Sequence, residues 1–327
     1  MSDLAISTYA SATGAHVLER PRSGRFEAFL AAFDEAAERE RLRALGLRYL
    51  GRSAQAFPGL LRAIHDPPPG LYVRGKGALE LLARPAVAIV GARACSAYGR
   101  AVARSLAREA AAAGVAVVSG LARGIDGEAH RGALDAGGIT IAVLGCGIDR
   151  DYPATHAELA RRVAAEGLIV SEYAPGVEPA PWRFPARNRI VAGLCGATVV
   201  VEARERSGAL ITADFALEEG REVLAVPGEI TSSLSDGSNA LLRLGATPLL
   251  SVDDVLAVFG LERSSRVEPP LDGPGAAVLE ALAEQPAGAD ELVRRTGLPP
   301  GELAAVLIQL ELVGRVSVGE GVYRVGV

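Results

Sequence analysis

The segment at residues 181–189 combines positive charge and aromatic rings at high density. It reads PWRFPARNR, with three arginines, no acid, the only tryptophan and a phenylalanine, in a chain that is 5% aromatic. Arginines can follow a phosphate backbone while rings and guanidinium planes stack on bases, so this composition is typical of a single-strand nucleic-acid contact. The alternative is a loop whose rings are core anchors and whose arginines are surface charges. The candidate contacts are Trp182, Phe184, Arg187, Asn188 and Arg189.

Arginines also gather between Arg84 and Arg108, a stretch with five cations and no acid. Within it, Gly91 and Arg93 directly follow an apolar, β-branched run, and Ser96 is placed to cap a helix over residues 97–112. The N-terminus of a helix presents unpaired N–H groups and partial positive charge, which favours anions. We therefore expect Arg93 to contact a phosphate, while the arginines farther along this helix fit a solvated face.

Small residues follow other apolar runs in the same way. Open α/β sheets bind ligands outside the carboxyl ends of their strands, and small residues there let a ligand approach the backbone. Two further strand exits of this kind are predicted to share one crevice with residues 181–189. Their candidate contacts are Ser119, Gly120, Arg123, Gly124, Ser207 and Gly208, with a simple helix cap as the alternative role of Ser207 and Gly208.

Motifs for catalysis or cofactor binding are missing from the sequence. It contains neither G-x-G-x-x-G nor G-x-x-x-x-G-K-[ST], and its four histidines and three cysteines show no metal-ligand spacing. Asp126, Glu172 and Glu202 could form a carboxylate pair for acid–base work, or they could cap helices and orient arginines. We favour the second role, since bare carboxylates repel phosphate. The sequence thus predicts no cofactor, no metal and no catalytic residue.

Six short apolar runs, each ending in Gly, Ser or a similar small residue and followed by a helical stretch, must position these side chains. They cover residues 87–90, 115–118, 139–144, 168–170, 198–201 and 223–226. Strands that are apolar at nearly every position are typical of a parallel sheet covered on both faces. The sequence therefore predicts an extended Rossmann-like, doubly wound, mostly parallel α/β domain over residues 84–260.

The remaining segments flank this domain. Residues 1–45 have apolar residues at helical spacing and predict a helical N-terminal region, and residues 46–83, rich in Pro and Gly, predict a connector with little regular structure. Residues 261–271 are expected to be a linker. Residues 272–327 predict three helices and a hairpin, the pattern of a winged-helix domain.

The C-terminal domain is acidic. Residues 272–327 contain eight acids and four arginines, a net charge of 4 − 8 = −4, and residues 299–314 hold no cation. A helix that reads the major groove should present Arg, Lys, Asn or Gln to the bases, and only Gln309 is available. We therefore favour a protein-binding or structural role for this domain over duplex recognition, which disfavours a transcription factor.

The overall composition is that of an ordinary globular protein. Of 327 residues 49% are hydrophobic and 22% charged, and the net charge of −5 excludes a protein that is basic all over. Lys76 is the only lysine, so arginine supplies nearly all positive charge. Three widely spaced cysteines, with neither a signal peptide nor a long apolar run, predict a reduced, cytoplasmic protein without membrane contact.

Several ordered motifs resemble those of the DNA-processing protein A family (DprA, also called Smf). They are VAIVGAR at 87–93, SGLARGID at 119–126, AVLGCGID at 142–149 with Tyr152-Pro153, FPARNR at 184–189, and the stretch from Glu202 through Ser207-Gly208 to Thr212. Pro227-Gly228 and Asp236-Gly237 with Asn239 complete the series. The resemblance extends over about residues 60–259, and the acidic winged helix fits the family as well.

The resemblance implies a non-catalytic protein that binds single-stranded DNA in an extended Rossmann-like domain. It also implies protection of incoming strands during natural transformation, help in loading the RecA recombinase, and homodimer formation, with single-strand-binding protein as a further candidate partner. By motif, the DNA pocket would include Arg93, Ser119, Gly120, Arg123, Phe184, Arg187 and Asn188. Residues 1–45 lack an evident G-x-G helix-hairpin-helix signature, so the resemblance implies at most a reduced sterile-alpha-motif-like domain there.

The alternative function is a Rossmann-type nucleotide-processing enzyme related to nucleoside-monophosphate phosphoribohydrolases. Such an enzyme would carry a P-G-G-x-G-T-x-x-E loop. The corresponding strand exit here reads EARERSG at residues 202–208, which disfavours the enzyme.

Overall fold

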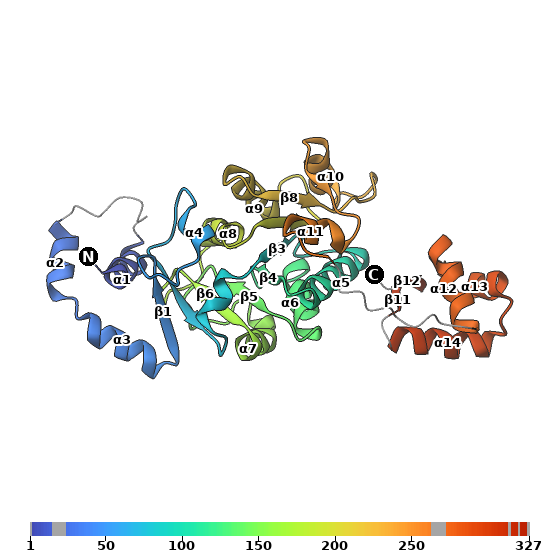
Figure 1. Cartoon of the computed structure of the whole chain (residues 1–327), viewed down its shortest axis with the longest axis horizontal. Helices are drawn as coiled ribbons and strands as arrows, with labels where there is room; N and C mark the ends of the chain where they lie inside the picture. Colours follow the sequence, from blue (N-terminus) through green and yellow to red (C-terminus); the bar gives the residue numbers. More distant parts are fainter. Residues whose placement is uncertain (1, 15–23, 263–272, 313–314, 320, 326–327) are drawn as a thin grey trace. The chain divides into compact units, whose positions relative to one another are not determined.

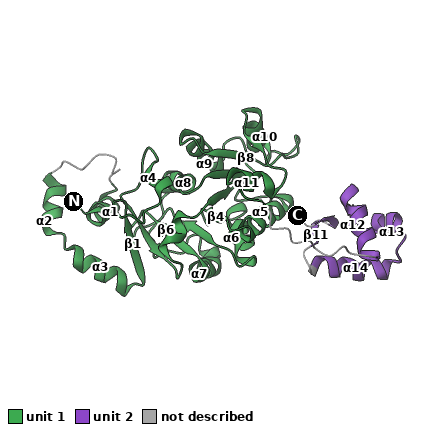
Figure 2. Cartoon of the chain, in the orientation of Figure 1, with its two compact units in different colours: residues 1–263 green, residues 264–327 purple. Residues whose placement is uncertain are grey.

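The computed structural model describes residues 2–14, 24–262, 273–312, 315–319 and 321–325. The chain divides into two compact units, Met1–Arg263 and Ser264–Val327, which Figure 2 colours separately. Among the described residues, no helix combines the length and the apolar character needed to cross a membrane.

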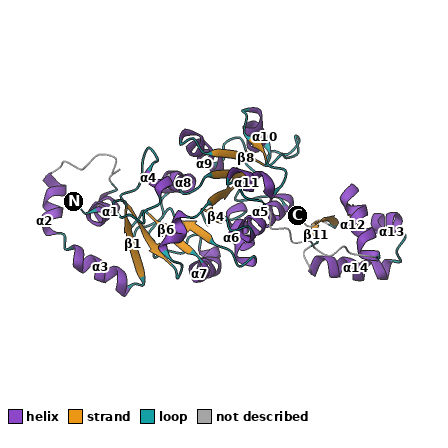
Figure 3. Cartoon of the chain, viewed as in Figure 1, coloured by secondary structure: helices purple, strands orange, loops and turns teal. Residues whose placement is uncertain are grey.

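The first unit is built on one nine-stranded sheet, with the order β1-β2-β6-β5-β4-β3-β7-β8-β9 (Figures 1 and 3). The strands from β6 to β9 run parallel, and β1 and β2 are antiparallel to their neighbours. The strands are β1 Leu47–Gly51, β2 Gly70–Arg74, β3 Ala86–Val90, β4 Ala116–Ser119, β5 Thr140–Val143, β6 Leu168–Ser171, β7 Ala197–Val200, β8 Glu222–Ala225 and β9 Thr247–Pro248. The six predicted strands and the mostly parallel α/β class are thus confirmed.

The connector expected at residues 46–83 is wrong. It contains β1, β2, the short helix α4 (Gly59–Arg62) and the 3-10 helix η1 (Leu79–Ala83). The two strands pair along their whole length, from Leu47 opposite Arg74 to Gly51 opposite Gly70, and Tyr49 packs edge-on against Tyr72. Long-range pairing and aromatic packing stabilise these strands, whereas the dense Pro and Gly between them are the only local signal.

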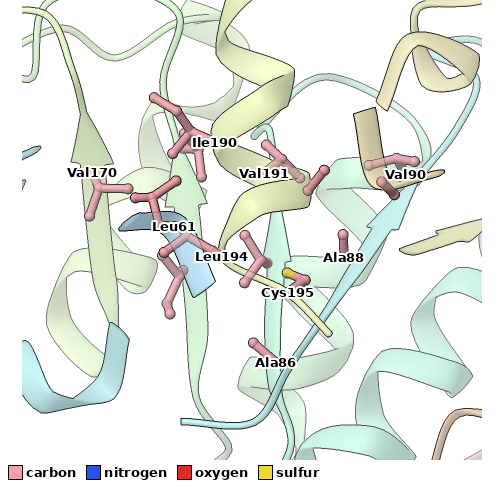
Figure 4. Packing of buried hydrophobic residues seen from close by; sticks show 14 of the residues in the cluster. Leu61, Ala86, Ala88, Val90, Val170, Ile190, Val191, Leu194 and Cys195 are labelled. Atoms are coloured by element: carbon pink, nitrogen blue, oxygen red, sulfur yellow. The ribbon is translucent and has the colours of Figure 1, made fainter. Parts of the chain in front are cut away.

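Helices cover both faces of the sheet. Alternate residues of β3 point to opposite sides, so Ala88 and Val90 join one buried cluster while Val87 and Ile89 join another. Figure 4 shows the first cluster, in which β3 meets Val191 beside Ile190 and Leu194. On that face lie α4, α8 Arg183–Gly193, α9 Gly208–Glu218 and α10 Asp236–Arg243; on the other lie α5 Ala97–Ala112, α6 Ile125–Asp135, α7 Ala157–Glu166 after η2 Ala154–His156, and α11 Val252–Val258.

Three helices precede the sheet, as the N-terminal pattern predicts: α1 Asp3–Thr13, α2 Gly24–Ala32 and α3 Glu35–Ala44. Ser2 caps α1, and Leu4 is fully buried in a cluster with Leu42 and Tyr72. The helical region therefore packs against β1 and β2 and belongs to the first unit.

The second unit has α12 Pro274–Glu284, α13 Ala289–Thr296 and α14 Pro300–Leu312, with a sheet of β10 Ala287–Gly288, β12 Val322–Val325 and β11 Val316–Gly319. Its core includes Val278, Leu292, Leu303 and Val316. The three helices and the hairpin of the winged-helix prediction are confirmed. Most of the expected linker at 261–271 lies outside the described residues.

Candidate nucleic-acid interface

A cleft of about 550 Å³ crosses the carboxyl ends of β3, β4 and β7, and a second hollow of about 340 Å³ extends from it past β5. Strand order reverses beside β3, which has β4 on one side and β7 on the other, the position where open α/β sheets bind ligands. Both hollows share Arg93, Gly120, Tyr152, Phe184 and Arg187 in their walls. We call the two together the arginine groove.

Helix α8 determines which side chains of residues 181–189 face the groove and which face away from it. The segment expected to overhang the crevice is not a loop: it becomes helical at Arg183, with Pro185 in the first turn, where no intrahelical N–H bond is lost. Phe184, Arg187, Asn188 and Val191 recur at i, i+3, i+4 and i+7 and line the groove from one face of the helix. The prediction that this segment contributes to the crevice is confirmed for that face.

Three side chains form a stack across the groove. The Arg93 guanidinium carbon lies 5.7 Å from the centroid of the Phe184 ring, and the Tyr152 ring stacks on Phe184 at 5.2 Å and 24°. Arg93 is exposed, and Tyr152 is 41% exposed. The groove therefore presents a cation and an aromatic surface side by side, the pairing that a strand of phosphates and bases requires.

Arg187 lies in the floor of the groove, 5% exposed. Its Nη1 donates to the carbonyl of Gly120 at 2.9 Å and to that of Val143. The negative charge of Asp126 offsets part of the free-energy cost of burying the guanidinium. Burial lowers the pKa of Arg187 and raises the pKa of Asp126, in each case against the attraction of the other group. This arginine is a fixed part of the groove floor.

The loop after β4 is held in a strained shape beside Arg187. Leu121 has φ +59°, in the left-handed region that disfavours side chains. Asp126 accepts hydrogen bonds from the backbone N–H of Gly120 at 3.1 Å and of Ala122 at 3.3 Å, and His156 Nδ1 donates to the Leu121 carbonyl at 3.0 Å. These bonds fix the loop that carries Gly120 into the groove.

The anion site expected at the start of α5 is already filled by the protein. Ser96 caps α5 as predicted, with its Oγ accepting from Gly99 N at 3.0 Å. Ser96 N and Oγ both donate to the buried carboxylate of Glu202, the N–H at 2.9 Å. A Cβ at Gly99 would lie 2.4 Å from this carboxylate, so glycine is required there. Glu202 thus caps a helix, as favoured, and Ser96 does not line the groove.

The other predicted contacts fall into two groups, those that line the groove and those that lie behind its wall. Gly91, Ser207 and Gly208 line the first hollow and Arg123 the second. Ser119 is fully buried, and its Oγ donates to the Ile89 carbonyl at 2.7 Å, which ties β4 to β3. Gly124 has φ +75° and packs so close to the Ala92 carbonyl that a Cβ would lie 2.2 Å from it. Ser119 and Gly124 therefore shape the groove from behind.

Arg189 and Trp182 lie on the far face of α8. Because residues two apart on a helix differ by about 200° in direction, Arg189 points away from Arg187. Its guanidinium meets Glu172 at 2.7 Å and Asp66 at 3.0 Å, both partly buried. This placement corrects the expectation that Arg189 lines the groove, and it gives Glu172 the arginine-orienting role that the sequence favours.

Sequence reasoning missed Tyr152, Arg204 and Arg206 as groove residues, although all three line the first hollow. Each had a signal: Tyr152 belongs to the recognised Tyr-Pro motif, and the two arginines come directly after a strand. Arg204 and Arg206 are exposed and lie on the loop from β7 to α9. That loop is joined to α8 by a hydrogen bond from Asn188 Nδ2 to the Gly208 carbonyl at 3.0 Å.

Metal and thiol chemistry find no support in the part of the chain that the structure describes. There, no group of three His, Cys, Asp or Glu side chains could hold a metal ion. All three cysteines are buried, and burial raises the pKa of Cys146 to about 11 and that of Cys195 well above its usual value.

Several known proteins are similar to this chain in sequence and in fold. DNA processing protein DprA of Streptococcus pneumoniae is 47% identical over 207 residues, 62% of this chain and 71% of that protein, and protein Smf of Escherichia coli is 38% identical over 282 residues, 83% of this chain and 75% of that one. The solved structure of the pneumococcal protein covers 78% of this chain and 92% of its own with a TM-score of 0.67 and 38% identity. A Helicobacter pylori structure, titled for its "unique single-stranded DNA binding mode", covers 65% of this chain and 95% of its own at a TM-score of 0.59 and 31% identity.

Family models agree with these relatives and with the structure. The DprA winged helix domain matches residues 262–321, and the model described as DNA recombination-mediator protein A matches residues 48–260. The second match begins within β1, so the two strands that sequence analysis missed belong to the family's domain. Since this match extends over more than half of the sequence, the chain belongs to the DNA recombination-mediator protein A family.

Proposed function

We propose that this protein binds single-stranded DNA in the arginine groove and acts as a recombination mediator without cleaving the strand. The observation that carries the proposal is the stack of Arg93, Phe184 and Tyr152 across the groove. The likeness to DNA processing protein A of Helicobacter pylori, which has a single-stranded DNA binding mode, supports it. Exposed arginines beside the exposed Tyr152 ring and the half-buried Phe184 ring fit a single strand better than a duplex, whose bases are not free to stack.

Each part of the groove takes a role in this binding. The exposed Arg93, Arg123, Arg204 and Arg206 contact phosphates, and Tyr152 with Phe184 stacks on bases. Gly91 and Gly120 let the groove floor pack closely, because a Cβ would lie 2.6 Å from Ile125 at the first position and 2.5 Å from Arg187 at the second. No proton transfer is assigned, because Asp126 and Glu202 already accept hydrogen bonds within the protein.

Partners follow from membership of a recombination-mediator family. We propose RecA recombinase as the protein that receives the bound strand, with self-association into a homodimer and single-strand-binding protein as a further contact. Natural transformation, in which incoming strands need protection, is the proposed setting, and the cytoplasm is the proposed location. The three buried, free cysteines fit a reducing compartment.

Fluorescence anisotropy with labelled oligo-dT at a series of salt concentrations tests the binding. Arg93→Ala should weaken affinity about tenfold, as for one charge-assisted hydrogen bond, and should lower the magnitude of the salt slope by about one. The matched control is Arg161→Ala in α7, which removes an exposed arginine that lines neither hollow and pairs with Glu158. Affinity that is unchanged by Arg93→Ala, or lowered equally by both variants, would contradict the groove assignment.

A further inference from the structure

A second stack of arginine and aromatic rings lies just outside the arginine groove, at the N-terminus of α8. The Arg183 guanidinium carbon lies 4.8 Å from the centroid of the Trp182 ring and 5.2 Å from that of Tyr173. The three side chains therefore form layers, with the cation between the two rings. Tyr173, at 9% exposure, is buried at one end of the stack, whereas Trp182 at the other end is 53% exposed.

The stack holds the indole in place. Arg183 Nη1 donates to the carbonyl of Glu178, and its charge interacts with the ring faces on both sides. A single exposed apolar side chain is ordinary in a soluble protein and by itself indicates nothing. A large ring that is fixed by a cation and still half open to solvent is a surface on which another flat ring can stack with little loss of conformational entropy.

Trp182 is next to the groove along the chain. Pro181 lines the first hollow and Phe184 lines both, so the residues on either side of the Trp182–Arg183 pair belong to the groove wall. Trp182 itself lines a narrow cleft of about 60 Å³ on the other side of the helix end. A strand that leaves the groove over Pro181 therefore meets the indole first.

Charge around Trp182 does not oppose a strand there. The acidic side chains in the narrow cleft are Asp66 and Glu172, and both form ion pairs with Arg189. Arg189 offsets one of these two negative charges, and Arg183, which also lines the cleft, offsets the other. The four groups together are therefore neutral and do not repel phosphate.

We propose that Trp182 is a base-stacking platform that continues the DNA path out of the arginine groove and across the N-terminus of α8. This inference rests on the proposed function and deepens it, since it assigns one face of α8 to the groove and the other to the strand beyond it. It requires an oligonucleotide long enough to fill the groove and extend past Pro181. Shorter oligonucleotides occupy the groove alone.

Trp182 is the only tryptophan in the chain, so tryptophan fluorescence, excited at wavelengths that the seven tyrosines do not absorb, reports on this position alone. Oligo-dT of increasing length is titrated while anisotropy and tryptophan fluorescence are followed together. Long oligonucleotides should quench the fluorescence in step with binding, whereas short ones should bind without quenching. Trp182→Ala should weaken binding of long oligo-dT about fivefold or more, as for one lost base stack, and should leave short oligo-dT unaffected.

Two further variants make the test specific. Trp182→Phe keeps a ring and should retain most of the affinity, and Leu217→Ala in α9 removes an equally exposed apolar side chain, 55% exposed, that lines neither hollow. Two results would overturn the platform without affecting the groove assignment. One is binding of long oligo-dT by anisotropy with no change in tryptophan fluorescence; the other is full affinity of Trp182→Ala for long oligo-dT. Absence of binding at every length would instead overturn the proposed function.

Discussion

The arginine groove and the winged-helix unit use the same cation in opposite ways. Within the described residues, Arg93, Arg204 and Arg206 in the groove form no ion pair with an acid. In the second unit, Arg294 and Arg295 both pair with Glu291, the first by donating from Nε and Nη2 to the same carboxylate oxygen. The difference shows that the availability of arginines, more than their number, makes a surface fit for phosphate.

Local sequence explains most of this difference. In α13, Glu291 precedes Arg294 and Arg295 by three and four residues, which is the spacing at which helical side chains meet. Arg93 lies in a stretch without acids. Arg204 and Arg206 stand next to Glu202 and Glu205, but Glu202 is engaged by Ser96, and the loop lacks the helical spacing that brings Glu291 to its arginines. Substitution of arginines that differ in their contacts with acids therefore tests this comparison between the two units.

Arg187→Ala should have the largest effect. It removes a buried cation and leaves the carbonyls of Gly120 and Val143 and the carboxylate of Asp126 without their partner, which should lower the free energy of unfolding by about 3–5 kcal/mol. Urea unfolding measures the loss. The same substitution should abolish binding of oligo-dT, because the floor of the groove and the loop at Gly120 depend on this side chain.

Arg294→Ala is the matched control from the other unit. This arginine is exposed, and among the described residues its one ion-pair partner is Glu291, so the free energy of unfolding should be unchanged within error. A loss of stability similar to that of Arg187→Ala would show that the two units do not differ as the contacts indicate. Arg189→Ala separates stability from binding in the groove: it should destabilise the first unit through Glu172 and Asp66, while the salt slope for oligo-dT short enough to occupy the groove alone stays as in the wild type.

Low pH should lower the stability of the first unit through a buried histidine, a residue type that the second unit lacks. All four histidines precede residue 264, and burial lowers the pKa of His130 to about 3 from its ordinary 6.5. The ring donates from Nδ1 to Thr140 Oγ1 at 2.7 Å, since that hydroxyl already donates to the Val117 carbonyl, and among the described residues Nε2 has no partner. A proton on Nε2 would be buried without a hydrogen bond.

The direction of the pH effect follows from this depressed pKa. Below pH 6.5 the unfolded chain binds a proton at His130 that the folded protein does not bind until about pH 3, so stability falls as the pH falls through this window. Between pH 6.5 and 5 the loss should be about 2 kcal/mol by urea unfolding. His130→Gln, which keeps a donor for Thr140 but does not titrate, should remove this part of the slope. An unchanged slope would show that other groups cause it.

The sequence predicts the helices and strands far better than it predicts which side chains interact with one another. Strands β3 to β8 and the helices of the winged-helix unit have local signals, either apolar runs that end in small residues or a regular helical period. Strands β1 and β2 do not, because only their mutual pairing across a long connection stabilises them. The groove was found because ligand sites in such sheets follow the strand ends, which is a property of topology.

The sequence does not predict contacts with acids that lie far away along the chain. Arg189 pairs with Asp66, 123 positions earlier, and the N-terminus of α5 is occupied by Glu202, 106 positions after Ser96. Nothing in the local composition distinguishes Arg189 from Arg187. Helical periodicity would have separated them if residues 181–189 had been recognised as the start of a helix, since Phe184, Arg187 and Asn188 share one face.

Removal of the winged-helix unit should have the smallest effect on DNA binding. A chain that ends at residue 271 loses four arginines, of which Arg294 and Arg295 are already paired with Glu291, and it loses a net charge of −4. Because the lost unit offers little available positive charge and its α14 contains no cation, affinity for oligo-dT should change by less than about twofold and the salt slope by less than one. Anisotropy on the full and shortened chains measures both. A tenfold loss would show that the winged helix contributes available cations after all, whereas a gain in affinity would show that its negative charge repels the strand, so either result would change the contrast between the two units.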